Sequence, residues 1–201
     1  MVAETYVERP HQEGMDAYQP TKNALDQVLI ELDGCELPLV RYETSPEGNK
    51  KRHLFWKEVR CGLTRQLSEA HKFYTASIGS YEQVNQKLFA LAALKGRRPS
   101  TQVIAVADGG QGLRESLEAS FSPLRFILDR YHLKGHFYQT AEALGKTPAA
   151  SRRWVEQQMD RLHQGQVTKA LKNLRRQQNQ NPRDRRRQLL AYLQRFQDCL
   201  D

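Results

Sequence analysis

The chain has 201 residues, of which 39% are hydrophobic and 27% charged, and its formal net charge is +8. That length suits one domain with or without a helical appendage. The sequence contains no apolar run of about 18 residues, the length needed to span a membrane, and its N-terminus has no signal-peptide pattern. The three cysteines, Cys35, Cys61 and Cys199, form no CxxC pair or disulfide framework, which favours a reducing, cytoplasmic compartment.

The first part of the chain predicts strands after an irregular lead-in over residues 1–24. Three strands are expected, over residues 27–34, 36–42 and 55–63. We expect the first two to form a hairpin across Asp33-Gly34-Cys35, because Asp-Gly is a frequent turn pair. Residues 44–49 have the composition of a loop.

The pattern then alternates between helices and strands. Helices are expected over residues 81–94 and 112–121, and strands over residues 103–107 and 126–128. From residue 131 onward only helical spacing remains, over residues 131–144, 148–162, 166–178 and 182–200. Strands followed by alternating units predict an α/β fold with a mixed sheet over residues 25–145, and residues 146–201 read as a basic helical region.

Three aspartates, Asp33, Asp108 and Asp129, each follow an apolar run that predicts a strand. The C-terminal ends of strands are where α/β folds gather ligands, and carboxylates from neighbouring strands can share divalent cations such as Mg²⁺. A metal pair about 3.5–4 Å apart activates the attacking oxygen of a phosphoryl transfer and stabilises the leaving one. Simpler roles stay open, because Asp-Gly is a common turn and Asp before a helix a common N-cap.

Residues 103–134 resemble the central block of bacterial insertion-sequence transposases. The matching motifs are VIAVADGG at 103–110, Phe121-Ser122-Pro123 and FILDRYHLK at 126–134, which contains Asp129-x-x-His132. The Kra-type family is the nearest in pattern, through Leu32-Asp33-Gly34, Trp56-Lys57-Glu58-Val59, Phe73-Tyr74 and Ile78-Gly79. The resemblance covers residues 27–145, and Mutator-like transposases share the broader layout.

This resemblance implies an RNase H-like fold and the DDE chemistry of DNA transposition. Asp33 and Asp108 match the first and second catalytic, metal-binding carboxylates, and Asp129 and His132 match a signature beside the active site. The complete enzyme would use two Mg²⁺ or Mn²⁺ ions to cut transposon ends and join them to target DNA, with a homo-oligomer as the expected transposition complex.

The third carboxylate of that family, a Glu on a late helix near small residues, has no counterpart here. Glu142 and Glu156 are the Glu residues after His132, and neither has that context. We therefore expect a truncated copy, or the first half of a split reading frame, with weak or absent strand transfer by itself.

The positive charge lies at the C-terminal end. Residues 1–124 contain 15 Lys and Arg against 16 Asp and Glu, whereas residues 125–201 contain 16 against 7, a net charge of +9. Such a segment suits a polyanion, although a solvated helical tail has the same composition. The candidate DNA contacts are Arg130, Lys134, Arg152, Arg153, Arg185, Arg186 and Arg187.

Three other interpretations of the sequence are possible. His132 and His136 have the spacing of an H-E-x-x-H zinc site, but Leu133 stands where that motif has Glu, so two unrelated helix residues are the better interpretation. The chain could also be a non-catalytic remnant that binds DNA through its basic end, or an RNase H-like nuclease with another substrate.

Overall fold

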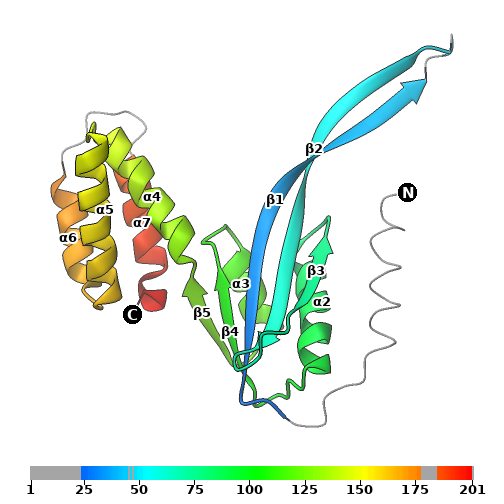
Figure 1. The fold of residues 1–201 in the computed structure, drawn as a ribbon, viewed down its shortest axis with the longest axis horizontal. Helices are drawn as coiled ribbons and strands as arrows, with labels where there is room; N and C mark the ends of the chain where they lie inside the picture. Colours follow the sequence, from blue (N-terminus) through cyan, green and yellow to red (C-terminus); the bar gives the residue numbers. More distant parts are fainter. Residues whose placement is uncertain (1–23, 45, 47, 178–184, 201) are drawn as a thin grey trace. The chain divides into compact units, whose positions relative to one another are not determined.

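The computed structural model describes residues 24–44, 46, 48–177 and 185–200, and Figure 1 shows its ribbon. Five strands form one sheet in the order β3-β2-β1-β4-β5. The chain divides into two compact units: Met1–Val106 with Gly112–Arg125, and Ala107–Gln111 with Phe126–Asp201. Across the described ranges, no helix is both long and apolar enough to cross a membrane.

The first unit is built on two long antiparallel strands, β1 (Gln27–Thr44) and β2 (Lys50–Gln66). The side chains of Val28, Ile30 and Leu32 are buried at the start of β1, whereas its later residues are mostly exposed. Figure 1 shows the later part of β1 and its β2 partner continuing as a twisted two-stranded ribbon. The short strand β3 (Phe73–Ser77) pairs with β2 on the other side.

The hairpin expected at Asp33-Gly34-Cys35 is wrong. Asp33 lies within β1 and pairs with Cys61, and β1 continues to Thr44. Asp-Gly permits a tight turn but does not force one, and the extended ladder continues through it. The first two predicted strands are therefore one strand, and the predicted third strand lies inside β2. The loop expected over residues 44–49 is where the two strands reverse, with residues 45 and 47 outside the described part.

The strands β4 (Gln102–Ala107) and β5 (Leu124–Leu128) complete the sheet. β4 lies next to β1 in the sheet, where Gln102 N donates to the carbonyl of Asp26 just before β1, and Figure 1 shows the two strands running in the same direction. β4 and β5 are parallel. Val103 N donates to the Pro123 carbonyl at their start, and Asp129 N donates to the Ala107 carbonyl at their end. A mixed sheet in the order 3-2-1-4-5, with antiparallel β1–β3, is RNase H-like and confirms the predicted fold class.

Helices α2 (Tyr81–Leu94) and α3 (Leu113–Ser120) belong to the first unit and lie close to their predicted positions. α2 packs on β2, β3 and α3. Its apolar face is buried, with Leu88 fully enclosed. The approach to the sheet is close: a Cβ added to Gly62 of β2 would lie 2.9 Å from a Leu88 methyl group. Gly62 therefore sets how near α2 can come to the sheet.

The second unit contains α4 (Arg130–Ala143), α5 (Pro148–His163), α6 (Val167–Arg176), α7 (Arg185–Arg195) and the short 3₁₀ helix η1 (Gln197–Cys199). α4 and α6 each contact both α5 and α7, which makes a bundle of the described helices. Its core includes Phe137, Val155, Leu174 and Leu193. α4, placed with the sheet region by the predicted division at residue 145, packs here with α5 and α7. Residues 182–184, where the last helix was expected to begin, lie outside the described part.

The contact between Gly62 and Leu88 predicts non-additive effects on stability. Gly62→Ala should cost about 1–3 kcal/mol because its methyl group overpacks the interface. Leu88→Ala should cost about 2–5 kcal/mol through the cavity that it leaves. The double variant should lose less unfolding free energy than the two single variants lose together, because the new methyl group occupies part of that cavity. Denaturant unfolding of all four proteins measures the coupling, and additivity within about 0.5 kcal/mol would contradict the close approach.

Candidate functional site

Asp108 begins a turn directly after β4, and the second unit brings it next to His132. The half-buried Asp108 holds one carboxylate oxygen, Oδ1, against the Gly110 amide at 3.0 Å. Its Oδ2 lies 3.9 Å from Nδ1 of His132, which is too long for a hydrogen bond but short enough for attraction when the imidazole is protonated. Two of the residues predicted from the sequence are thus neighbours.

Asp129 explains why they are neighbours. Its carboxylate is the N-cap of α4, with Oδ1 accepting from the amides of Tyr131 at 2.6 Å and His132 at 3.0 Å. Its own amide donates to the Ala107 carbonyl at 2.8 Å. The capping role considered for Asp129 is therefore present, and it anchors the start of α4 beside the residue that precedes Asp108.

Asp33 lies in the first unit, on an exposed part of β1. The expectation that it ends a strand is wrong, although it does lie where the buried part of β1 ends. Its Oδ1 accepts from the Gly34 amide at 2.8 Å. Across the strand pair, burial raises the pKa of the Cys61 thiol, and Cys35 and Asp33 raise it further, so this thiol stays protonated at neutral pH.

The carboxylates fit a magnesium ion only in part. Within the ranges described, no group of three or more His, Cys, Asp or Glu side chains could hold a metal ion. Glu142 on α4 and Glu156 on α5 are exposed. Mg²⁺ is nevertheless often held by one or two carboxylates with water and substrate phosphate. Asp33 and Asp108 each have one oxygen fixed by a following amide, which orients the carboxylate without using its second oxygen.

Tyr192 of α7 covers the turn that carries Asp108, and sequence reasoning missed it. A Cβ added to Gly109 would overlap the Tyr192 ring, so any other residue there would displace the ring. The Tyr192 ring also packs on His136, with ring centroids 4.6 Å apart, and on Phe196 at 5.1 Å. Within the second unit, α7 therefore lies directly against the turn after β4.

The surroundings keep Tyr192 and His136 neutral at physiological pH. Burial raises the pKa of Tyr192 to about 12; the Asp108 and Asp129 carboxylates add to the rise, while the Gly109 amide and Arg195 oppose it. Burial also lowers the pKa of His136, helped by His132 and Arg185 and opposed by Asp108. Both rings thus act as uncharged groups beside the carboxylates.

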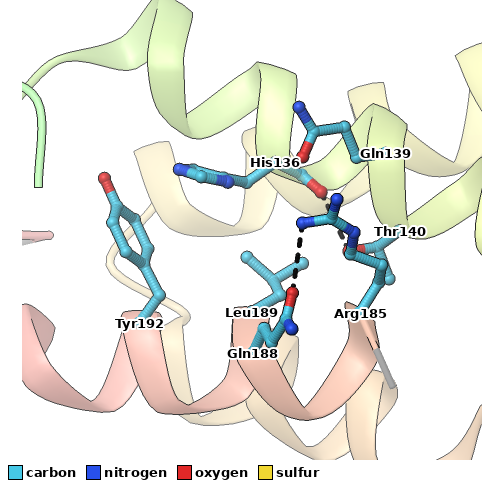
Figure 2. A pocket seen from close by; sticks show the side chains of 7 residues that line it. All are labelled: His136, Gln139, Thr140, Arg185, Gln188, Leu189 and Tyr192. Carbon is cyan, nitrogen blue, oxygen red and sulfur yellow. Dashed lines mark hydrogen bonds between the residues drawn. The ribbon is translucent and has the colours of Figure 1, made fainter. Parts of the chain in front are cut away.

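A pocket of about 160 Å³ lies between α4 and α7, as Figure 2 shows. It is lined by His136, Gln139, Thr140, Arg185, Gln188, Leu189 and Tyr192. The Arg185 guanidinium donates to Gln188 Oε1 at 3.1 Å, one of the dashed lines in Figure 2. The spacing of these α7 residues is visible in the sequence as one helical face. Its partner on α4 is not visible there, because it depends on how two separate helices pack.

The predicted DNA contacts are spread over the second unit. Most are at the surface on α4, α5 and α7: Arg130, Arg152, Arg153, Arg185 and Arg187 are exposed, and Lys134 is half-buried. Arg186 differs, because its guanidinium donates to the carbonyls of Arg175 at 3.2 Å and Gln177 at 2.7 Å. These bonds satisfy the C-terminal end of α6, so Arg186 has a structural partner.

The environment of Tyr192 predicts a pH-dependent stability difference. Its buried hydroxyl faces the Gly109 amide but makes no hydrogen bond of standard geometry among the described residues, so Tyr192→Phe should leave stability at pH 7 unchanged or slightly higher. The folded pKa of Tyr192 lies above the unfolded value of about 10. Wild type therefore keeps the stabilising contribution of the neutral, buried phenol below pH 10, and its free energy of unfolding falls as pH rises towards 12. The variant should gain about 1–2 kcal/mol over wild type across that window, after allowing for solvent screening.

Urea unfolding at several pH values, with EDTA present, measures this difference. Tyr131→Phe, at an exposed tyrosine, is the matched control for the loss of one hydroxyl. A stability difference for Tyr192→Phe that stays constant from pH 9 to pH 12 would contradict the raised pKa.

In comparisons with known proteins, no family model and no curated protein matches this chain. Among solved structures, the chain is similar to the Drosophila P element transposase strand transfer complex, with 13% sequence identity and a TM-score of 0.39. The matched region covers 63% of this chain and 33% of that chain, so this chain spans about a third of that protein's length.

Proposed function

We propose that this chain carries the RNase H-like core of a DDE-type DNA transposase, which cuts and joins DNA strands by phosphoryl transfer. The carrying observation is the placement of two aspartates on neighbouring parallel strands: Asp33 lies on β1, and Asp108 directly follows β4. The amide of Gln102, the first residue of β4, donates to the carbonyl of Asp26, the residue just before β1. Asp33 lies seven residues after Asp26, and Asp108 lies six residues after Gln102. Both strands therefore reach a carboxylate after nearly the same length.

Under this proposal, Asp33 and Asp108 are the residues that hold divalent cations. Mg²⁺ or Mn²⁺ bound there would stabilise negative charge on the reacting phosphate and activate the attacking oxygen. The protein's own contribution is orientation, because the amides of Gly34 and Gly110 each fix one oxygen of these carboxylates. The expected activity is weak, since no third carboxylate completes the site in the described residues.

Asp129 and His132 are positioning residues in this scheme. The Asp129 cap holds the first turn of α4, and that turn carries His132 to within 3.9 Å of the Asp108 carboxylate. His132 can there orient Asp108 or donate to a DNA phosphate. Loss of the cap should therefore disturb Asp108 indirectly.

A second candidate function is DNA binding without cleavage. It is favoured by the lack of a three-donor metal group among the described residues and by the exposure of Asp33. Such a protein would depend on the basic helices of the second unit rather than on the two aspartates. The two candidates differ in what substitution of the aspartates does.

Metal binding tests the leading proposal without requiring turnover. Asp33→Asn and Asp108→Asn should each weaken Mn²⁺ binding about tenfold or more, because each removes a charged oxygen ligand from a site with few of them. Electron paramagnetic resonance of free Mn²⁺ measures the affinity. Asp26→Asn, at an exposed aspartate just before β1, is the matched control and should bind Mn²⁺ as wild type does.

A cleavage assay separates the two candidate functions. Nicking of supercoiled plasmid in Mg²⁺, however slow, should disappear in Asp33→Asn and Asp108→Asn and persist in Asp26→Asn. DNA binding by all four proteins with no cleavage by any of them would support the second candidate. Nicking that survives both aspartate substitutions would contradict the proposed metal ligands.

A further inference from the structure

A basic hollow of about 220 Å³ lies on the second unit between α5 and α6, and we call it the α5–α6 hollow. Its lining is Arg161 from α5 and Lys169, Lys172, Asn173 and Arg176 from α6. None of these residues is among the DNA contacts expected from the sequence. Four of the five are cations, and no lining residue is acidic.

The packing of α6 directs these cations outward. Lys169, Lys172 and Arg176 are spaced three and four residues apart, so they share one face of the helix, and all three are exposed. The opposite face is buried, through Val167, Ala170, Leu171 and Leu174. Because that apolar face is fixed against the bundle, rotation of α6 cannot remove the positive face from the surface.

The charge of the hollow is not neutralised within the second unit's described residues. No ion pair there joins any of its four cations to a carboxylate, and α6 contains no Asp or Glu. The partners that do occur are neutral amides: Arg161 donates to Gln158 Oε1 at 3.0 Å, and Lys169 to Gln166 Oε1 at 3.3 Å. Like charges three and four residues apart repel along the helix, and a bound anion would relieve that repulsion.

Asn173 adds a donor to the same surface. Trp154 Nε1 donates to Asn173 Oδ1 at 3.4 Å, so the amide oxygen is engaged and the amide nitrogen remains to donate. Guanidinium, ammonium and amide NH₂ groups together present donors only. The ligand that fits is rich in acceptors and negatively charged, which are the properties of a phosphodiester.

We propose that the α5–α6 hollow binds the phosphate backbone of duplex DNA. Lys169 and Arg176 are seven residues apart, a rise of about 10.5 Å along a helix. Each DNA strand carries a phosphate about every 3.4 Å along the duplex axis, so the cationic face spans several phosphates and not one free ion. Such contacts position DNA without reading its sequence. The choice of DNA as partner rests on the proposed function, whereas the anion site does not depend on the metal ligands.

The test removes three exposed cations together, in the variant Lys169→Gln, Lys172→Gln, Arg176→Gln. Its affinity for a random-sequence DNA duplex is measured by fluorescence anisotropy across a salt series, with EDTA present so that no cleavage occurs. At about 0.1 M salt the dissociation constant should rise about tenfold or more. The slope of log K against log salt should become shallower by about 2–3, one for each lost phosphate contact.

The matched control removes the same charge from the first unit, in the variant Lys50→Gln, Lys57→Gln, Lys72→Gln, whose three lysines are also exposed. It should change the affinity less than about threefold and keep the wild-type slope. A third variant, Lys169→Arg, Lys172→Arg, keeps the charge and should bind DNA as wild type does. Circular dichroism and thermal unfolding show whether each variant is folded.

Two outcomes would overturn the proposal: wild-type affinity and slope in the first triple variant, or an equal loss in the first-unit control. Failure of the proposed catalytic function can be distinguished from failure of the proposed anion site. If Asp33→Asn and Asp108→Asn change neither metal binding nor cleavage while the hollow variant loses DNA, the anion site stands and the catalytic proposal falls.

Discussion

The hydrogen bond from the Asp129 amide to the Ala107 carbonyl is the constraint on which the candidate site depends. It joins the residue that follows β5 to the last residue of β4, and the Asp129 carboxylate at the same time caps α4. One residue thus fixes the end of a strand pair and the start of a helix. Because His132 lies in the first turn of α4, the same constraint sets its 3.9 Å separation from Asp108.

The turn after β4 is held from a second direction by α7. Gly109 has no side chain, and the Tyr192 ring occupies the space that any Cβ would need. This contact costs the phenol its solvation, which raises the pKa of Tyr192, and the nearby carboxylates add to that effect. As a result, two uncharged rings, those of Tyr192 and His136, lie close to the Asp108 carboxylate.

Positive charge is organised differently in the second unit. Arg186 is used internally, because its guanidinium satisfies the carbonyls at the end of α6. The cations of the α5–α6 hollow have only neutral amide partners among the described side chains. The cations behind the net charge of +9 over residues 125–201 therefore have two roles. One is to bond to the carbonyls at the end of a helix, and the other is to present donors to a polyanion.

The sequence by itself determined the features that depend on local chemistry: the strands that precede Asp108 and Asp129, the helices after residue 131 and the Asp129 cap, since apolar runs and N-caps involve neighbours in the chain. Tertiary structure decided the rest. Asp33-Gly34 resembles a turn, yet β1 continues through it in its pairing with β2, and β3, which the sequence pattern did not predict, pairs with the other edge of β2. The Tyr192–Gly109 contact and the α5–α6 hollow join residues from different elements, and only packing could bring them together.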